Sequence, residues 1–565
     1  MTEQFEPKWR STPPAEGTYR EVLMFDPKST SHPSAGWVKM FLEEFEIKPE
    51  DFRPDFPDGD QPISVQQRPA LAETHRAALA AIVGVENAVD DDVSRVRYGL
   101  GKSLDEDIDL RRGHTPLLPD LVIHPRHKQD VAEVVAYCHE NRIPIVPFGG
   151  GSSVVLGTKA NEGGVVLVLT THMNQIVEVN ELNQTVTVQA GMLGPAYEAE
   201  LNDAKNLHGS AHNYTGGHFP QSFHLATVGG WIAALGSGQA STYYGDAYDL
   251  VLAQEYVTPV GVISTKHFPA TASGPKVNDI LKGSEGTFGV LTELTLKIYR
   301  HQPENTARFA LMMPTWEAAV DAAREITQGE FGKPAVLRIS DPEETERALA
   351  LKGFDGGLAQ KYLTSRKMLP GGRCLLLGNA EGEKKFAAHV AKSALAVGRA
   401  HGGINLTAMA TKAWERGRYS DVHVRNDIVD FSMIIDTFET SVTWDNLHDV
   451  HSNVRKLIKA RPGTVCMTHA SHFYSAGTNL YFILILKPQS PEEYFEFRSK
   501  ILASIIENGG SPSHHHGTGE LTGPLMEEHL GTTQMNVLRA LKEHFDPHHI
   551  MNPGWTLGFD TKVRK

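Results

Sequence analysis

The chain has 565 residues, of which 40% are hydrophobic and 22% charged, and its formal net charge is −14. This length predicts roughly three or four domain-sized pieces of a globular protein. The negative charge, together with the lack of any run rich in lysine and arginine, argues against nucleic acid as a partner. The three cysteines, Cys138, Cys374 and Cys466, are far apart, so neither a disulfide framework nor a zinc–thiolate site is expected.

The sequences of the two chain ends and the distribution of apolar residues predict where in the cell the protein is found. The first ten residues lack the apolar core of a signal peptide, and no run of 18 apolar residues occurs. The last five residues, Thr-Lys-Val-Arg-Lys, are not the Ser-Lys-Leu peroxisomal address. We therefore expect a cytoplasmic protein that does not span a membrane, and the sequence leaves peripheral membrane contact and a homodimer open.

Four segments follow one another along the chain. Residues 1–115 are rich in Pro, Asp and Glu, with helices expected at 37–45 and 70–83, and form an N-terminal packing region. Residues 116–300 start as a βαβ unit (strand 121–123, helix 128–138, a strand ending at 148) and continue with a hairpin of strands 176–179 and 185–188. Residues 301–490, with a helix at 315–327 and strands at 335–339, 375–378, 431–435 and 480–486, predict a cap with an antiparallel sheet. Residues 491–565 carry helices and a histidine loop.

The strand near residue 143 runs into a glycine loop that is suited to a diphosphate. Glycines lack a Cβ, so the backbone can approach a ligand with several N–H groups aimed at it, and two serine hydroxyls add donors. The loop fits neither G-x-G-x-x-G nor G-x-x-x-x-G-K-[ST], which disfavours a Rossmann or ATPase site. Taken alone, such a glycine-rich turn is more often an ordinary turn in a loop with no ligand. The residues concerned are Pro147, Phe148, Gly149, Gly150, Gly151, Ser152 and Ser153.

Two further glycine segments follow along the chain. The second contributes Thr227, Gly229, Gly230, Ala234, Gly236 and Ser237, with Gln221 and Ser222 just before it, and the third contributes Gly283, Ser284, Glu285, Gly286, Thr287 and Gly289. In this order and spacing the three segments resemble the vanillyl-alcohol oxidase/p-cresol methylhydroxylase (PCMH) family of FAD-binding proteins. The resemblance implies an α+β fold, with a PCMH-type FAD-binding domain and an α/β cap for the substrate. It also implies that FAD is the cofactor of this flavoprotein. The first loop would hold the pyrophosphate, the second would line the flavin, and the third would support the adenosine half.

Three adjacent histidines, His514, His515 and His516, lie in a loop rich in glycine and serine. At most two of them can face one cavity, and imidazole exchanges protons near neutral pH. Taken alone, the loop would be better interpreted as a solvent-exposed turn or as a nonspecific metal-binding tract. The loop, however, resembles that of the alkyldihydroxyacetonephosphate synthase family, and four more segments match that family in order.

These four segments imply further site residues. They place His218 and Tyr481 at catalytic positions, with Tyr481 expected on a strand edge, and Arg338 and Arg425 at substrate-binding positions. Singly, each arginine would be interpreted as a surface ion pair and the tyrosine as a core aromatic. Together with the histidines they suit an anionic substrate, because an arginine grips a phosphate or carboxylate with two parallel hydrogen bonds. No metal ligand set is expected.

The resemblance implies a transferase of ether lipid biosynthesis. Such an enzyme, an alkylglycerone-phosphate synthase, exchanges the acyl group of the lipid phosphate acyl-dihydroxyacetone phosphate for a fatty alcohol, without net redox chemistry. One departure is that Phe219 and Gln221 stand where the family has acidic residues.

Two alternatives stay open. An FAD-linked oxidase or dehydrogenase of a 2-hydroxy acid such as D-lactate or glycolate could use the same fold. The Gly-His-x-Gly-Asp-Gly-Asn motif of D-lactate-dehydrogenase-like members is missing at Tyr481, which disfavours it, whereas Phe219 and Gln221 favour it. A flavoprotein without enzymatic activity is the third interpretation.

Overall fold

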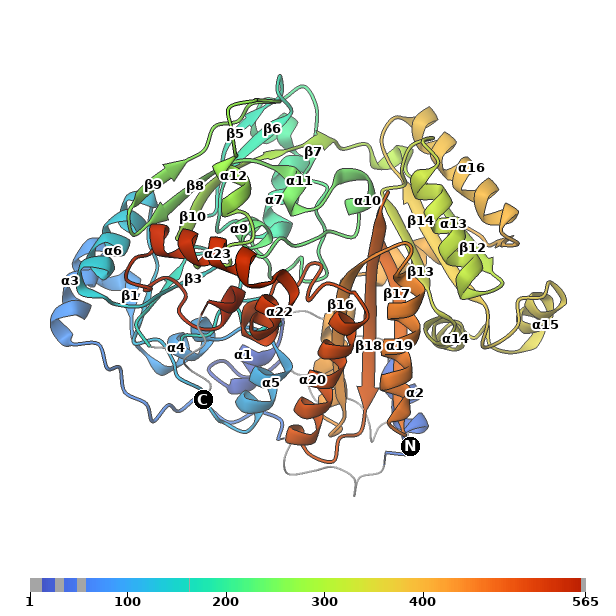
Figure 1. Ribbon diagram of the computed structural model, residues 1–565, viewed down its shortest axis with the longest axis horizontal. Coiled ribbons are helices and arrows are strands. Elements are labelled where there is room, and N and C mark those ends of the chain that lie inside the picture. Colours follow the sequence, from blue (N-terminus) through green and yellow to red (C-terminus); the bar gives the residue numbers. More distant parts are fainter. Residues whose placement is uncertain (1–12, 26–34, 48–56, 162, 560–565) are drawn as a thin grey trace.

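The computed structural model describes residues 13–25, 35–47, 57–161 and 163–559. The two chain ends interpreted above, residues 1–10 and 561–565, lie outside this range. The described chain forms a mixed α+β fold whose sheets lie in two halves of the molecule (Figure 1). None of its helices is long and apolar enough to cross a bilayer.

A small, largely parallel sheet carries the first glycine loop. Its strand order is β1 (Ala88–Val89), β2 (Leu121–Ile123), β4 (Val165–Val168) and β3 (Ile145–Phe148). Both β2 and β3 pair with β4 in parallel, and helix α6 (Lys128–Asn141) connects β2 to β3. Helix α6 buries Val131, Val134, Val135 and Cys138 at helical spacing, as the sequence pattern predicts. The predicted βαβ start is confirmed.

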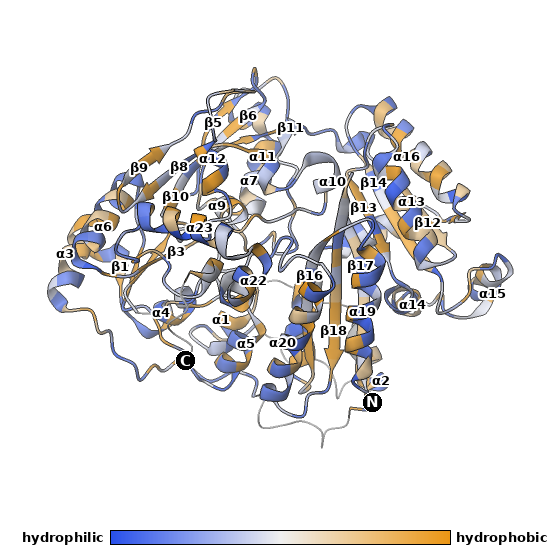
Figure 2. Cartoon of the chain, viewed as in Figure 1, coloured by the Kyte–Doolittle hydropathy of each residue, from blue (hydrophilic) through white to orange (hydrophobic). Residues whose placement is uncertain are grey.

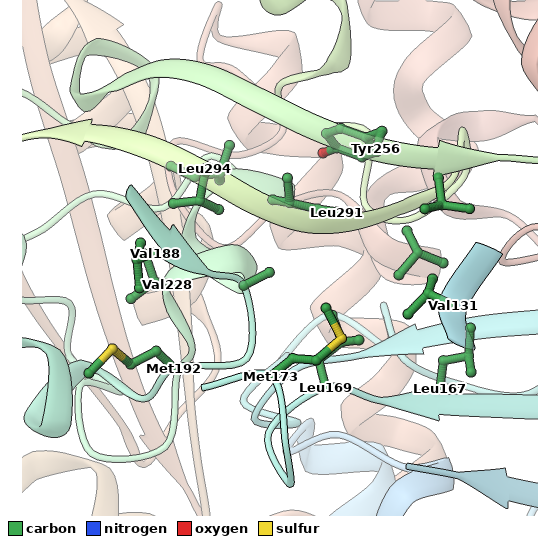
Figure 3. Packing of buried hydrophobic residues seen from close by; sticks show 14 of the residues in the cluster. Val131, Leu167, Leu169, Met173, Val188, Met192, Val228, Tyr256, Leu291 and Leu294 are labelled. Atoms are coloured by element: carbon green, nitrogen blue, oxygen red, sulfur yellow. The ribbon is translucent and has the colours of Figure 1, made fainter. Parts of the chain in front are cut away.

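A five-stranded antiparallel sheet completes this half of the molecule. Its order is β5 (Ile176–Asn180), β6 (Thr185–Gln189), β10 (Val290–Lys297), β8 (Val251–Thr258) and β9 (Gly261–Ser264). Strands β5 and β6 form the predicted hairpin. Figure 3 shows the core between the two sheets, where Leu167 and Val131 lie near Leu291. Short elements fill the connections: α7 (Gly194–Asn202), α8 (Ala204–Leu207), β7 (Tyr214–Thr215), α9 (Val228–Ala233), α10 (Ser241–Tyr244), α11 (Ala247–Leu250), α12 (Val277–Leu281) and β11 (Tyr299–Arg300).

The second half is a seven-stranded sheet in which every pairing is antiparallel, as predicted. Its order is β15 (Ile404–Asn405), β12 (Ala307–Met313), β14 (Cys374–Ala380), β13 (Val336–Ser340), β17 (Thr464–Tyr474), β18 (Gly477–Leu486) and β16 (Ile434–Thr443). The strand expected at 431–435 starts only at Ile434, because Ser432 has a turn conformation with φ 59°.

Four helices pack on one face of this sheet, and its other face is shared between the cavity and side chains of α2 (Ala35–Glu44) and α18 (Val424–Val429). The apolar stripes of α13 (Trp316–Gln328), α16 (Lys384–Ala400), α19 (Leu447–Ala460) and α20 (Pro491–Glu507) share one core with its strands. Figure 2 shows these helices with one hydrophobic and one hydrophilic side, next to the mostly hydrophobic strand β18. The remaining helices of this half are α14 (Pro342–Leu351), α15 (Gly357–Ser365), α17 (Met409–Gly417) and α18 (Val424–Val429).

The N-terminal and C-terminal parts of the described chain each pack against both halves of the molecule. From the N-terminal part, Leu79 of α3 (Glu73–Val83) joins the FAD-side core, while Leu104 of α5 (Leu104–Arg111) joins the cap core. The C-terminal segment also divides, because α20 packs in the cap core and Phe545 of α23 (Thr532–Phe545) packs in the FAD-side core. The other terminal helices are α1 (Tyr19–Leu23), α2 (Ala35–Glu44), α4 (Asp92–Gly99), α21 (Gly519–Thr522) and α22 (Met526–Leu530).

Candidate active site

One cavity of about 410 Å³ lies between the two halves. Its wall is formed by all three glycine segments and by side chains of the seven-stranded sheet. Of the 21 residues predicted to bind the cofactor, all line it except Gly283, Ser284 and Thr287. Ser284 and Thr287 are buried and Gly283 is half-buried, and they shape the third loop from behind; for example, the hydroxyl of Thr287 donates to the carbonyl of Ser284 at 2.7 Å.

The first and second glycine segments touch each other so closely that side chains would not fit between them. A Cβ on Gly150 would lie 1.6 Å from the carbonyl oxygen of Leu225, and one on Gly149 would lie 2.4 Å from Oγ1 of Thr227. Thr227 also caps helix α9, because its hydroxyl accepts the N–H of Gly230 at 3.1 Å. The result is a cavity wall made mostly of backbone, which suits a diphosphate.

The third loop and the histidine loop are joined through Glu285. The N–H of Glu285 donates to the carbonyl of Ala233 at 2.9 Å, which ties the third loop to helix α9. Its carboxylate accepts the N–H groups of Thr518 at 2.7 Å and Gly519 at 2.9 Å, and the Thr518 hydroxyl at 2.9 Å. The predicted cofactor loop therefore positions the end of the histidine loop.

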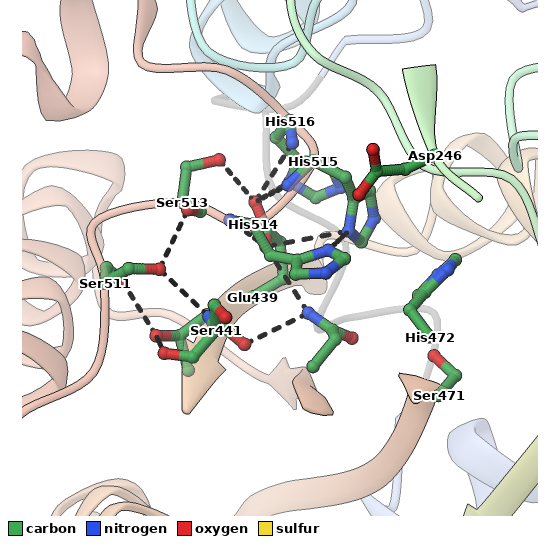
Figure 4. Close-up of polar contacts among 12 residues, drawn as sticks. Asp246, Glu439, Ser441, Ser471, His472, Ser511, Ser513, His514, His515 and His516 are labelled. Carbon is green, nitrogen blue, oxygen red and sulfur yellow. Dashed lines mark hydrogen bonds and ion pairs between the residues drawn. The ribbon is translucent and has the colours of Figure 1, made fainter. Parts of the chain in front are cut away.

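The other end of the histidine loop is held by Glu439 of strand β16. Its carboxylate accepts the backbone N–H groups of His514 at 2.6 Å, His515 at 3.2 Å and His516 at 3.0 Å, and the Ser513 hydroxyl at 2.7 Å (Figure 4). Burial by itself raises the pKa of Glu439, but His516, His514 and these hydrogen bonds outweigh it and lower the pKa below the ordinary value. Glu439, His514 and His515 offer ligand atoms within 4.8 Å of one another. Since the carboxylate already accepts five donors, the fifth being the Asn479 amide at 3.4 Å, we interpret the group as an anchor for the loop.

A stack of rings leads across the sheet face into the cavity. In the strand register Tyr481 lies opposite His469 on one side and Glu439 on the other. The ring of Tyr481 stacks on His469 at 4.9 Å and on His515 at 5.8 Å between centroids. The expectation of a strand edge for Tyr481 is wrong, because β18 is paired on both sides; the residue reaches the cavity from the sheet face instead.

Burial keeps His514 and His515 neutral at pH 7. It lowers the pKa of His514 to about 4, against the opposing effect of Glu439, and it lowers the pKa of His515 well below its ordinary value, with His516 and His514 adding to the effect. His515 and His516 line the cavity, whereas His514 points away from it, so two of the three face it, within the predicted limit.

The two predicted substrate arginines both line the cavity but differ in their partners. Arg338 is bound through Nη2 to Glu344 at 2.5 Å and to Nδ1 of His469 at 3.0 Å. Arg425 donates through Nη1 to the carbonyl of Lys102, and its Nε lies 3.4 Å from Asp107. Its Nη2 is buried and has no hydrogen-bond partner among the described residues. Arg425 therefore has a buried donor left for an anion.

His218 lies outside this cavity. It is buried behind Trp231, at 4.6 Å between ring centroids, and neither ring nitrogen has a hydrogen-bond partner within the described chain. Burial lowers its pKa to about 3. Of the two departures from the family pattern, Gln221 lines the cavity and donates to the carbonyl of Arg418 at 2.7 Å, and Phe219 packs under the Arg418 guanidinium.

Several cavity residues were not selected from the sequence. On β17, Met467, His469 and Ser471 alternate and face the cavity, a period-two signal that could have been used. His472 breaks that alternation and still lines the cavity, because the strand is bulged between Ser471 and Tyr474. No sequence pattern marks such a bulge.

Part of the same cavity is apolar. This region brings together side chains from the N-terminal part, helix α18 and three strands of the cap sheet. They are Phe25, Phe41, Leu104, Val424, Ile435, Met467 and Ile483. The cavity therefore combines a wall of glycine backbone, a guanidinium with an unpaired donor, proton-exchanging rings and an apolar wall.

The comparisons with known proteins agree with this geometry. Residues 119–265 match the family model described as "FAD binding domain", and residues 302–555 match "FAD linked oxidases, C-terminal domain". Alkyldihydroxyacetonephosphate synthase of Dictyostelium discoideum is 31% identical over 82% of this chain and 77% of its own length. Glycolate oxidase subunit GlcD of Bacillus subtilis is 26% identical over 86% and 97%.

Among solved structures, too, a synthase aligns better with this chain than a more distant flavoenzyme does. A structure of alkyldihydroxyacetonephosphate synthase aligns with a TM-score of 0.76 at 29% identity, covering 91% of this chain and 92% of that one. p-Cresol methylhydroxylase aligns with a TM-score of 0.67 at 14% identity, covering 87% and 98%, and shows the shared fold. The chain belongs to the alkyldihydroxyacetonephosphate synthase family of FAD-binding flavoproteins.

Proposed function

We propose that this protein is an FAD-dependent alkylglycerone-phosphate synthase, which exchanges the acyl group of acyl-dihydroxyacetone phosphate for a fatty alcohol in ether lipid biosynthesis. The observation that carries this proposal is the single cavity in which the donor left on Arg425 and the Tyr481–His515 stack share a wall with a cluster of apolar side chains. A small hydroxy acid would leave that apolar wall without a partner.

The proposal assigns FAD to the cradle of residues 116–300 and the lipid phosphate to the cap, residues 301–490. The glycine loops fit a dinucleotide because their backbone forms the wall and a Cβ at Gly150 has no room. FAD, when bound there, supplies the isoalloxazine ring beside which the substrate carbon reacts. Arg425 would bind the substrate phosphate, and the apolar side chains would hold the alkyl chains.

Tyr481, His515 and His516 are proposed to move protons at the substrate carbon and at the incoming alcohol. Neutral imidazoles can accept a proton without first losing one, and burial holds the His515 pKa low enough for that state. We assign no direct step to His514, which does not line the cavity, or to His218, which lies behind Trp231.

The second candidate is an FAD-linked oxidase or dehydrogenase of a 2-hydroxy acid, supported by the similarity to the glycolate oxidase subunit and by Phe219 and Gln221. One pair of assays separates the two. Purified holoenzyme given palmitoyl-dihydroxyacetone phosphate and hexadecanol should yield alkyl-dihydroxyacetone phosphate and free palmitate without an electron acceptor. Anaerobic mixing with D-lactate, glycolate or D-2-hydroxyglutarate should leave the flavin absorbance unchanged. Bleaching by a hydroxy acid, with no ether product, would overturn the proposal in favour of the dehydrogenase.

A further inference from the structure

A chain of hydrogen bonds leads from the cavity toward the surface, on the side of the histidine loop away from the apolar wall. Nδ1 of His515 lies 2.9 Å from Nδ1 of His514, and Nε2 of His514 lies 2.8 Å from the hydroxyl of Tyr474. The Tyr474 hydroxyl also contacts Oδ2 of Asp246 at 3.1 Å. Asp246 is half-buried and its neighbour Asp249 is exposed (Figure 4 shows Asp246 beside the histidines).

Three separate parts of the fold build this chain. Tyr474 ends strand β17 just after the bulge, where His472 has a positive φ of 54°, a conformation that non-glycine residues seldom adopt. Asp246 caps helix α11, and its Oδ1 accepts the N–H of Tyr248 at 3.1 Å. Glu439 fixes the backbone of His514. The bulge and the helix cap thus aim Tyr474 and Asp246 at the outer face of His514, which has no contact with the cavity.

We propose that His515, His514, Tyr474 and Asp246 form a proton relay between the cavity and solvent. This inference rests on the proposed function. In that reaction the bond from the substrate carbon to the leaving carboxylate breaks and a bond to the alcohol oxygen forms. The fatty acid leaves ionised at neutral pH, so the alcohol proton is released in every turnover. It must leave an enclosed site.

The relay moves this proton without leaving a net charge on either histidine ring or on the tyrosine. Nε2 of His515 takes the proton while its Nδ1 hydrogen passes to Nδ1 of His514. The Nε2 hydrogen of His514 then passes to Tyr474, whose phenolic proton goes to the Asp246 carboxylate and from there to water. Each ring ends neutral in its other tautomer, and a separate tautomer exchange of the two rings, not the reverse transfer, resets the chain for the next turnover.

The electrostatic environment suits this direction of transfer. Burial, reinforced by the neighbouring histidines, keeps His515 neutral, and burial keeps His514 neutral against the opposing effect of Glu439. Burial and then Asp246 raise the pKa of Tyr474, so its phenol stays protonated at rest. Burial and then Asp249 raise the pKa of Asp246, so its carboxylate is a better proton acceptor than an exposed one. His472, itself neutral through burial, packs 5.2 Å from the His514 ring and bonds Ser241 instead of joining the chain.

The test uses Y474F and D246N in the full-length, FAD-loaded enzyme, with ether formation measured in H₂O and D₂O from pH 6 to 9. Both variants should lower kcat by about 10- to 100-fold, with little change in KM, in line with the contribution of proton-transfer groups. Added imidazole should restore part of the turnover of D246N, and D246E should retain more activity than D246N. Y214F, which removes the hydroxyl from a comparable Tyr214–Glu181 pair 2.8 Å apart on the other side of the FAD half, should behave like wild type.

The possible results separate the relay from the proposed function. Wild-type ether synthesis with unchanged kcat and solvent isotope effect in Y474F and D246N would overturn the relay alone. Absence of ether product from wild-type enzyme would overturn the proposed function. The relay is then judged by infrared spectroscopy of the resting enzyme: a protonated-carboxyl band that forms on acidification, vanishes in D246N and shifts its midpoint in Y474F supports it. A band at the same midpoint in Y474F contradicts it.

Discussion

Glu439 and Glu285 hold the two ends of the histidine loop, and they come from opposite halves of the molecule. Glu439 accepts N–H groups of residues 514–516 from the cap sheet, and Glu285 accepts those of Thr518 and Gly519 from the third glycine segment. The position of His515 in the cavity therefore depends on the FAD half and the cap staying in register. Binding of the cofactor to the third segment is thereby coupled to the geometry of the proton-exchanging rings.

The first prediction concerns the Glu439 anchor. Glu439→Gln keeps the size of the side chain but replaces a charged acceptor of five hydrogen bonds with a neutral amide. We expect the free energy of unfolding to fall by about 1.5–3 kcal/mol, the value of a hydrogen bond to a charged group, and kcat to fall more than tenfold. Denaturant unfolding and steady-state assays measure the two effects. Wild-type kcat in this variant would show that the anchor does not position the loop.

A pH dependence follows from Glu344. Burial opposes its ionisation, but Arg338 and His469 outweigh this and lower the pKa of Glu344 to about 2. Because the folded pKa lies below the unfolded value near 4.5, the stabilisation is complete above pH 4.5 and is lost as the pH falls from there toward 2. Unfolding measured between pH 6 and 2 should show a steeper loss for wild type than for Glu344→Gln. Glu528→Gln, at an exposed carboxylate, serves as the control and should follow the wild-type curve.

The two arginines should respond differently to substitution. Arg425→Lys keeps a charge but loses the planar fork, so we expect KM for the phosphate substrate to rise at least tenfold while FAD stays bound. Arg338→Lys should raise KM much less, because Nη2 of its guanidinium is already bound to both Glu344 and His469. Steady-state kinetics on both variants measures this. A larger KM effect at Arg338 would move the phosphate site there.

Much of this arrangement follows from the sequence, and the remainder depends on contacts between distant segments. Three glycine segments in order identified the cradle, and the strand segments at 335–339, 375–378, 431–435 and 480–486 predicted the antiparallel cap sheet. Glu439 was part of a recognised segment, yet nothing local marked it as the partner of a loop 75 residues later. His472 was beyond prediction because a bulge, rather than strand alternation, turns it toward the cavity. The edge position expected for Tyr481 failed because strand order is a property of the whole sheet.

Tyr481→Phe tests the ring stack. The substitution removes only the hydroxyl, and the ring should keep its stacking on His469 and His515. We therefore expect normal FAD content and thermal stability within about 1 kcal/mol of wild type, but at least a hundredfold loss of kcat, as for loss of a proton-transfer group. Flavin absorbance, thermal unfolding and product formation measure the three quantities. Retained turnover would mean that the histidines suffice for proton transfer.

The last prediction concerns Gly150. The sequence suggests that a side chain here would collide with the diphosphate, but the structure shows an earlier obstacle: the new Cβ would lie 1.6 Å from the Leu225 carbonyl oxygen, which is backbone and cannot rotate away. Gly150→Ala should thus separate the first two glycine segments and abolish FAD retention, whereas Gly417→Ala, with no atom within 4 Å of its Cβ, should retain a full complement. Acid precipitation followed by absorbance of the supernatant measures the flavin per chain. We expect the cradle to hold FAD without a covalent bond, so wild type should release all of its flavin. Colour left in the wild-type pellet would contradict noncovalent binding. Full flavin content in Gly150→Ala would show that the contact between the two segments is not needed to hold the cofactor.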